Sequence, residues 1–517
     1  MRDQGADRVV DTAYLVRRAT AAYGGLIAVS DGVRALTFTE LLARAERLAG
    51  ALERLGVPQG AAVGVLSENR SEYVEVDVAI ALSRRVRVAL NARLHVDDHR
   101  FVAADSDMRA LIYSGSFAEE ATTIAREAGI PAIALDAPAD GGLCLESLIS
   151  KAGSEVPRSV GDAEQPAWIT YTSGTTGRPK GVVLSIRSIR EVAFNLLLEL
   201  GPVRPGDRLV LPQPLSHGAG YFVLPWLMSG AELRVMRRFD PEEAWLVAEL
   251  GDGRVSTFKC VPAMVPPLLE ADRGAPLGYE TIVYGAAPMP RPVLESALDR
   301  FGPILVQVYG QSEAPVTLTC LHKRDHEAEG PQRFSAGRPF RPVGLEIRDD
   351  SGEPLPPGET GEVAVTGSHV MTGYHGLPDE TDKVLRSGWI LTKDVGVIDE
   401  SGFVYLLGRR DEMINSGGFN ISPREVEQVI SSFGGVEEVA VLGVPDERWG
   451  QAVKALVKMR NGATVNESEL IEFTRPRLGF RTPKELKIVA AIPKNAYGKV
   501  DRKQALAELT PAEEPRP

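Results

Sequence analysis

Short apolar runs alternate with amphipathic stretches through most of the chain, and this alternation constrains the fold more than any other feature. The runs AAVGVLS (61–67) and RALIYSG (109–115) are each followed by a helical stretch, and PAWITYTS (166–173) is followed by a hydroxyl-rich loop and then a helical stretch. Residues 37–56 carry apolar residues at helical spacing and end at a glycine. Strands that alternate with helices in this way predict layered α/β structure with largely parallel sheets.

The sequence changes in character after about residue 340, where short β-like segments with Gly/Pro turns appear. A compact region follows and contains the helix signal NISPREVEQVISSFGG. Ser422 can cap this helix, with Glu425 completing a capping box. We therefore expect a large N-terminal domain (1–408) of layered α/β subdomains with a β-rich portion. A small, mobile α+β C-terminal domain (409–517) would follow it.

The charge balance is acidic, with 58 Lys and Arg residues against 70 Asp and Glu residues, for a net charge of −12. This disfavours nucleic-acid and anionic-membrane partners. No segment reaches the roughly 18 uninterrupted apolar residues of a membrane-spanning helix. Cys144, Cys260 and Cys320 are far apart, which indicates reduced thiols. We expect a cytoplasmic monomer or homodimer with no nucleic-acid and no membrane partner.

The segment YTSGTTGRPKG (171–181) carries the composition of a phosphate-binding loop. Its glycines let backbone N–H groups approach an anion, its hydroxyls add donors, and Lys180 adds a positive charge. The residue order differs from the G-x-x-x-x-G-K-[ST] pattern of a Walker A loop. The segment therefore predicts a phosphate site of another kind.

This loop resembles that of the adenylate-forming superfamily, which contains acyl- and aryl-CoA ligases, peptide-synthetase adenylation domains and luciferases. Further motifs resemble that family in the same order, and together they span nearly the whole chain. They are PLSHGAG (214–220), YGAAP (284–288), VYGQSEAP (308–315), GWILTKD (388–394), GRRDEMINSGGFNISPREVE (408–427) and PKNAYGKVDR (493–502). The motif YGQSEAP is most similar to that of acyl- and aryl-CoA ligases.

The resemblance implies an ATP site with Mg²⁺ bound at Glu313. The residues that it places around ATP are Thr172, Ser173, Gly174, Thr175, Thr176, Gly177, Lys180, Gly285, Ala286, Ala287, Tyr309, Gly310, Ser312, Asp394 and Arg409. Lys499 would bridge the substrate carboxylate and the α-phosphate, and His217 would lie beside that carboxylate. Together with Glu313, these two residues form the implied catalytic set.

For the second half-reaction, the resemblance implies a hinge at Asp411, about which the small domain rotates. Gly417 and Gly418 would line the path of the pantetheine arm, and Trp449 and Phe480 match aromatic residues that hold the CoA adenine in some aryl-CoA ligases. Apolar residues near His217 would form the acid pocket and suit an aromatic or medium-chain acid. The candidates for this pocket are Tyr221, Phe222, Val261 and Met264.

Three positions depart from the family pattern. Lys393 replaces a usual glycine, which requires a backbone outside the glycine-only region and brings a cation to the nucleotide pocket or to solvent. Ser312 replaces a threonine, and Arg84 replaces a small residue. The first hypothesis remains an ATP-dependent acid–CoA ligase. The alternatives are transfer to a carrier-protein phosphopantetheine, adenylation of an oxyanion such as nitrite, and a nucleotide-binding pseudoenzyme.

Overall fold

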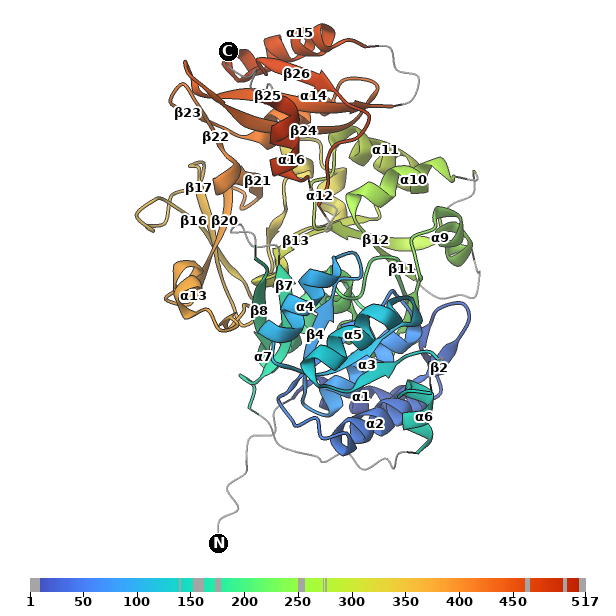
Figure 1. Ribbon diagram of the computed structural model, residues 1–517. Coiled ribbons are helices and arrows are strands. Elements are labelled where there is room, and N and C mark those ends of the chain that lie inside the picture. Colours follow the sequence, from blue (N-terminus) through green and yellow to red (C-terminus); the bar gives the residue numbers. More distant parts are fainter. Residues whose placement is uncertain are drawn as a thin grey trace.

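The computed structural model describes residues 10–138, 141–151, 162–172, 178–249, 256–272, 274, 277–460, 465–495 and 500–510. Within these residues the strands form four sheets, of which two are large and mostly parallel. Figure 1 shows the C-terminal sheet with its helices at one end of the molecule and the larger sheets at the other. This arrangement confirms the predicted α/β class with a smaller α+β unit at the C-terminal end.

The first large sheet has nine strands and carries the candidate nucleotide motifs. Its order is β15 (Arg338–Pro339), β14 (Ala314–Leu321), β13 (Leu305–Gln311), β12 (Tyr279–Gly285), β11 (Ser256–Cys260), β9 (Arg208–Leu211), β10 (Glu232–Val235), β1 (Ile27–Ser30), β2 (Ala35–Thr37). Strands β13, β12, β11, β9, β10 and β1 pair in parallel, and the strands at both edges are antiparallel.

The second large sheet has seven strands and carries both ends of the phosphate-loop segment. Its order is β18 (Gly373–Tyr374), β8 (Lys180–Ser185), β7 (Pro166–Thr172), β4 (Val86–Leu90), β3 (Ala62–Leu66), β5 (Met108–Tyr113), β6 (Ala132–Ala134). Every residue of β3 and β4 is buried, as expected for parallel strands covered on both faces.

Two helices lie between the large sheets. Helix α3 (Ser71–Leu82) contacts β4 of one sheet and β1 of the other, and α7 (Ile186–Glu199) contacts β8 and β14. Most residues of α3 are buried, because a helix in a middle layer must be apolar on more than one side. The predicted helix over 37–56 forms α2 (Phe38–Arg54), with Thr37 and Glu40 making its capping box.

The remaining N-terminal helices pack on other helices or on the strands of the large sheets. They are α1 (Thr12–Tyr23), α4 (Val96–Asp105), α5 (Ala118–Ala128), α6 (Leu145–Ser150), α8 (Val223–Met228), α9 (Pro241–Ala248), α10 (Val265–Glu270), α11 (Arg291–Phe301) and α12 (Lys323–Glu327). Helices α4 and α5 pack together at the edge formed by β5 and β6.

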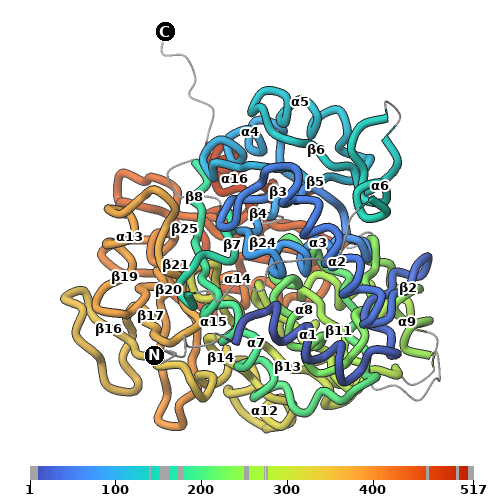
Figure 2. The backbone as a smooth tube through the Cα atoms, turned by 90° about the horizontal axis from the view of Figure 1, so that it is seen from below, coloured from blue at the N-terminus to red at the C-terminus, as the bar shows by residue number. Residues whose placement is uncertain are grey.

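The predicted β-rich portion is a five-stranded sheet that contains β16 (Gly344–Arg348), β17 (Gly361–Thr366), β20 (Trp389–Ile398), β19 (Leu385–Arg386) and β21 (Val404–Arg409). Helix α13 (Pro378–Val384) leads into it. Figure 2 shows these strands on one side of the molecule, opposite β2 and α9.

The last sheet contains β23 (Phe419–Ile421), β22 (Ile414–Ser416), β25 (Gly450–Met459), β24 (Val436–Asp446) and β26 (Glu485–Ile488). Helices α14 (Pro423–Ser431), α15 (Glu467–Leu478) and α16 (Arg502–Leu509) pack on it. Ser422 caps α14 by accepting from the Glu425 N–H at 3.2 Å. The predicted full capping box is wrong, because the Glu425 carboxylate pairs with Arg481 instead.

Candidate active site

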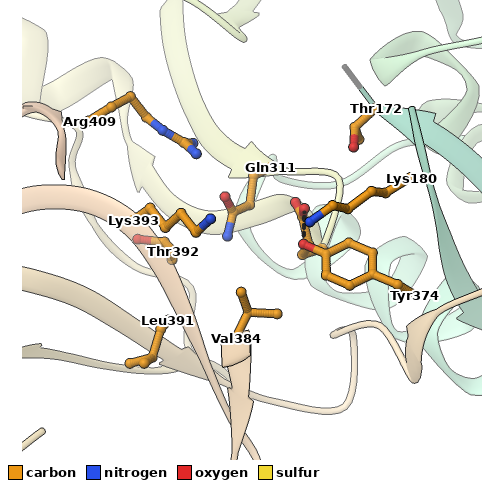
Figure 3. A pocket seen from close by; sticks show the side chains of 10 residues that line it. Thr172, Lys180, Gln311, Tyr374, Val384, Leu391, Thr392, Lys393 and Arg409 are labelled. Carbon is orange, nitrogen blue, oxygen red and sulfur yellow. Dashed lines mark hydrogen bonds between the residues drawn. The ribbon is translucent and has the colours of Figure 1, made fainter. Parts of the chain in front are cut away.

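A cavity lies where the two large sheets meet the β-rich portion. Its lining residues are Thr172, Lys180, Gln311, Glu313, Tyr374, Val384, Leu391, Thr392, Lys393 and Arg409. Figure 3 shows Lys180, Lys393 and Arg409 directed at this space from different elements. Four predicted nucleotide residues, Thr172, Lys180, Glu313 and Arg409, are therefore brought together from distant parts of the sequence.

The phosphate loop itself leaves the sheet at Thr172, the last residue of β7, and returns at Lys180, the first residue of β8. These two residues are also cross-strand partners. The predicted phosphate contacts Ser173, Gly174, Thr175, Thr176 and Gly177 lie outside the described residues, as does Lys499.

Lys180 is held toward the cavity by an ion pair. Its Nζ donates to Glu380 Oε2 of α13 at 2.6 Å and lies 5.3 Å from the centre of the Tyr374 ring. The hydrogen bonds from Lys180 and then Lys383 lower the pKa of Glu380 to about 2. Glu380 is therefore ionised at neutral pH and offsets the charge of Lys180.

Glu313 occupies the turn between β13 and β14, next to Ser312. Gln311 and Ala314 pair across this turn, so the carboxylate is presented at the end of a tight hairpin. Its Oε1 accepts a hydrogen bond of 2.7 Å from the Tyr374 hydroxyl. Among the described residues, no group of three or more His, Cys, Asp or Glu side chains could bind a metal. One carboxylate nevertheless suits Mg²⁺, which takes its other ligands from phosphate and water.

Asp394 lies close to Arg409 of the cavity lining and links two other predicted residues. The Tyr309 hydroxyl donates to Asp394 Oδ2, and Arg409 Nη1 lies 3.5 Å from Asp394 Oδ1. Burial, and then the neighbouring Asp394 charge, raise the pKa of Tyr309 well above its usual value. Tyr309 therefore remains a hydrogen-bond donor and fixes the carboxylate predicted to bind ribose.

The predicted adenine segment begins at the end of the strand next to the one that carries Tyr309. Gly285 ends β12 and pairs with Val308, and the adjacent Ala286 has a φ of 67°. A Cβ at Gly285 would lie 2.2 Å from the Val308 carbonyl oxygen, so this close approach requires glycine. Gly310 is constrained similarly, because a Cβ there would lie 2.2 Å from the Val316 backbone nitrogen. Ala287 follows Ala286 and is exposed.

His217 lies immediately before the 3₁₀ turn Gly218–Phe222 and is absent from the lining of the cavity in Figure 3. Its Nδ1 lies 2.8 Å from the Ser216 hydroxyl. The loop that carries it is fixed at Leu215, whose N–H donates to Asn69 Oδ1 at 2.8 Å. The Leu215 carbonyl accepts from Arg87 Nη2 at 2.7 Å. The loop position thus depends on the seven-stranded sheet and its connections.

A second cavity lies behind Tyr221, one of the residues predicted for the acid pocket. Its lining residues are Thr12, Val16, Asp77, Val78, Ala81, Trp168, Ile189, Gly220, Tyr221, Val223, Leu224 and Leu227. Phe222 is instead fully buried in the core, and Val261 and Met264 line neither of these two cavities. Of the four predicted acid-pocket residues, only Tyr221 lies at this apolar space.

In the C-terminal sheet, Gly417 and Gly418 form the turn between β22 and β23, with φ values of 61° and 84°. The Gly417 N–H donates to the Trp449 carbonyl at 2.8 Å. Trp449 and Phe480 are 37% and 58% exposed, respectively, and the Lys484 Nζ lies 5.3 Å from the Trp449 ring centre. The four residues predicted for CoA therefore lie in the C-terminal unit, with two exposed aromatic rings.

Tyr374 and Gln311 are among the lining residues that the sequence analysis did not identify. Tyr374 also holds Glu313. Tyr374 stands in the segment TGYHGLP, in which a Gly-Tyr pair precedes a turn, but nothing in that pattern identifies a carboxylate partner. Gln311 directly precedes Ser312 and Glu313, which were predicted for the site, so its place in that motif could have identified it.

An enzyme that joins two anions needs cations and a carboxylate suited to a metal ion near its nucleotide, and the first cavity brings residues of these types together. Fold and site thus define a nucleotide-dependent ligase of the adenylate-forming class. The chain belongs to the AMP-binding enzyme family, whose model matches residues 16–375. The model of the AMP-binding enzyme C-terminal domain matches residues 425–499. The predicted family resemblance is confirmed.

Curated relatives align along almost the full chain. The medium/long-chain-fatty-acid–CoA ligase FadD8 of Mycobacterium tuberculosis is 34% identical over 92% of this chain and 86% of its own. A feruloyl-CoA synthase from Amycolatopsis sp is 36% identical over 97% and 98%. The amide bond synthetase McbA from Marinactinospora thermotolerans has a TM-score of 0.87, with 28% identity over 96% of this chain and 100% of its own.

Proposed function

We propose that this protein uses ATP to activate a carboxylic acid as an acyl-adenylate and then transfers the acyl group to CoA. The products are acyl-CoA, AMP and pyrophosphate. The observation that carries this proposal is the cavity in which Thr172, Lys180, Glu313 and Arg409 converge. These are the two ends of a phosphate loop, a carboxylate suited to Mg²⁺ and a second cation.

In the first step, a carboxylate oxygen of the acid attacks the α-phosphorus, and the bond to the departing pyrophosphate breaks with its electron pair. Lys180 and Arg409 reduce the repulsion between the two anions and stabilise the charge that develops. Mg²⁺, held at Glu313, would neutralise phosphate oxygens and orient them. Tyr309 and Asp394 would hold the nucleoside beside the segment Gly285–Ala287.

We further propose that Lys499 supplies the cation that bridges the acid carboxylate and the α-phosphate, with His217 beside the carboxylate. Domain boundaries at 1–408 and 409–517 and a hinge at Asp411 would let the small domain bring Lys499 in and then withdraw it. The last strand of the β-rich sheet ends at Arg409, and the next strand begins at Ile414, so the proposed hinge lies in the connection between sheets.

In the second step, the CoA thiol, having lost its proton, attacks the acyl carbonyl and AMP leaves. Free CoA is favoured over a carrier protein by the exposed surface around Trp449. The Arg448 guanidinium and the Lys484 ammonium lie 4.7 and 5.3 Å from the Trp449 ring centre. Exposed aromatic faces with adjacent cations suit a purine and its phosphates. A carrier-protein phosphopantetheine remains the alternative acceptor.

The apolar second cavity supports an aryl or medium-chain acid as the small-molecule partner. Tyr221 lies in the 3₁₀ turn that starts directly after His217. The centre of the Trp168 ring lies 5.0 Å from the centre of the Tyr221 ring. Strand β7 carries both Trp168, which lines the second cavity, and Thr172, which lines the first, and these two residues are four positions or roughly 13 Å apart along the strand. A compact acid of that length would reach from one to the other.

We also infer that the protein acts in the cytoplasm as a monomer or homodimer. Cys144, Cys260 and Cys320 are all free thiols, as expected in a reducing compartment. In the described part of the chain, no helix is both long and apolar enough to cross a membrane. Sedimentation of the purified protein would distinguish monomer from homodimer.

The test is an acid panel assayed for acid-dependent pyrophosphate exchange, followed by addition of CoA and mass spectrometry of the thioester. Aryl and medium-chain acids should give exchange and acyl-CoA. Pyrophosphate exchange without a CoA thioester, but with acylation of a carrier protein or an amine, would show that CoA is not the acceptor. Exchange with nitrite alone would show that the activated substrate is not a carboxylic acid. ATP binding without exchange for any acid would contradict the proposed function and indicate a pseudoenzyme.

A further inference from the structure

Lys393 is held in a backbone conformation that is unfavourable for a lysine. Its φ is 62°, in the left-handed region that favours glycine. The sequence requires a backbone outside the glycine-only region here, and the left-handed region that Lys393 occupies favours glycine but is open to other residues at a cost. Of the described non-glycine residues with positive φ, Lys393 alone lines the candidate active-site cavity.

The unusual backbone belongs to a bulge in β20. The register of the β17–β20 pairing shifts between Glu362 and Ala364. Glu362 lies opposite Val395, and Ala364 lies opposite Leu391. The Lys393 N–H donates to Glu362 Oε1 at 2.8 Å, and the Thr392 hydroxyl donates to the Val363 carbonyl at 2.7 Å. Bulges next to active sites redirect side chains. Here the bulge is fixed by neighbouring groups and directs Lys393 into the cavity.

The charge of Lys393 is not offset in the same way as that of its neighbours. Lys180 is paired with Glu380 at 2.6 Å, and Arg409 lies 3.5 Å from Asp394. Within the described ranges, the Lys393 ammonium makes no hydrogen bond or ion pair. Figure 3 shows the Lys393 side chain pointing toward Gln311, into the same space that the Arg409 side chain faces. Three cations with one carboxylate, Glu313, line a cavity that is therefore suited to a polyanion.

We propose that Lys393 is a polyphosphate-binding residue, whose ammonium contacts the triphosphate of ATP. This inference rests on the proposed function. Strained backbone persists at sites where function depends on it, and a left-handed lysine in a cavity lined by cations fits that pattern. Because Glu380 partly neutralises Lys180, Lys393 supplies a positive charge that the phosphate loop alone would lack.

The test separates backbone strain from charge by replacing Lys393 with Gly, Met or Arg. Lys393→Gly relieves the left-handed strain, so its Tm should rise. Its Kd for ATP, measured by calorimetry, should rise by about 10-fold or more through loss of a charged contact. The Kd for adenosine, which has no phosphate, should not change. Lys393→Met should weaken ATP binding without the gain in Tm, and Lys393→Arg should retain most of the affinity.

Ser387→Gly is the matched control, because Ser387 is exposed, has a φ of 50° and lies outside the cavity lining. This variant should raise Tm and leave ATP affinity unchanged. Unchanged ATP affinity in both Lys393→Gly and Lys393→Met would overturn the inference, as would equal losses for ATP and adenosine. If the wild type binds ATP through Lys393 but activates no acid, the proposed function fails while this inference stands.

Discussion

The Tyr374 hydroxyl donates a hydrogen bond of 2.7 Å to Glu313 Oε1 and so joins β18 to the hairpin turn after β13. Burial, and then the Glu313 charge, raise the pKa of Tyr374 above its usual value. The hydroxyl therefore remains protonated at neutral pH and serves as a permanent donor. It fixes one oxygen of the carboxylate on which the proposed Mg²⁺ site depends.

Tyr374→Phe should raise the Mg²⁺ concentration needed for half-maximal pyrophosphate exchange by roughly 10-fold, the usual scale for removing a group that orients a metal ligand. The ring that lies 5.3 Å from Lys180 Nζ is retained in this variant. ATP affinity without Mg²⁺ should therefore change little. A half-maximal Mg²⁺ concentration equal to that of the wild type would show that the hydrogen bond does not position Glu313 for metal.

Lys499→Ala should lower acid-dependent pyrophosphate exchange by at least roughly 10²-fold, the scale for losing one transition-state donor. Thioester formation from acyl-adenylate supplied directly should be retained, because the proposed role of Lys499 belongs to the first step. Lys494→Ala is the control, because Lys494 belongs to the same motif as Lys499 but its Nζ pairs with Glu438 at 2.8 Å. Exchange close to that of the wild type in Lys499→Ala would remove this residue from the mechanism.

Trp449→Ala should raise the KM for CoA by about 10-fold while leaving pyrophosphate exchange unchanged, because a stacking face is worth about 1–3 kcal/mol. The Gly417 contact is made to the Trp449 backbone carbonyl and survives the substitution. Tyr14→Ala, which removes another exposed aromatic ring (53% exposed) on α1, should affect neither quantity. An unaltered KM in Trp449→Ala would place the CoA nucleotide elsewhere.

Ala81→Leu should narrow the range of acids that are activated. Ala81 lines the second cavity from α3, so added side-chain volume there fills space without touching the cavity around Glu313. The kcat/KM for the longest acids accepted by the wild type should fall by about 10- to 100-fold, and that for the shortest should stay the same. An equal loss of kcat/KM for all acids, or no loss for any acid, would show that the second cavity is not the acid site.

Much of the fold and several site contacts could be predicted from the sequence because they depend on local pattern. The alternation of apolar runs predicted the layered sheets, and the ends of the phosphate loop do reach the same cavity as Glu313 and Arg409. The half-formed cap of α14 shows where such reasoning stops. Glu425 has the right spacing for a capping box, but Arg481, far along the chain, binds its carboxylate.

The remaining features are long-range relationships that no local pattern encodes. Tyr374 was missed because its partner Glu313 is far away in the sequence and borders another sheet. Asn69 and Arg87 were missed because they act on the loop before His217 through the Leu215 backbone. The left-handed φ of Lys393 belongs to a bulge whose register is set by pairing with β17, and residue type alone does not predict it.

His369 provides a prediction about pH and stability. Its side chain is 1% exposed, and neither ring nitrogen has a hydrogen-bond partner among the described residues. Burial, and then the nearby charge of Arg187, lower the pKa of His369 to about 4. Its unfolded pKa is near 6.5. Between these values the unfolded chain binds a proton that the folded chain does not, so stability is full above pH 6.5 and falls toward pH 4.

His369→Leu should therefore flatten the dependence of the unfolding free energy on pH by one proton, about 1.4 kcal/mol per pH unit between pH 6 and 4.5. At pH 7 the variant should be as stable as the wild type or more so, because an unpaired buried polar ring is replaced by an apolar side chain. Urea unfolding at several pH values measures this, and parallel curves for His369→Leu and the wild type would refute it.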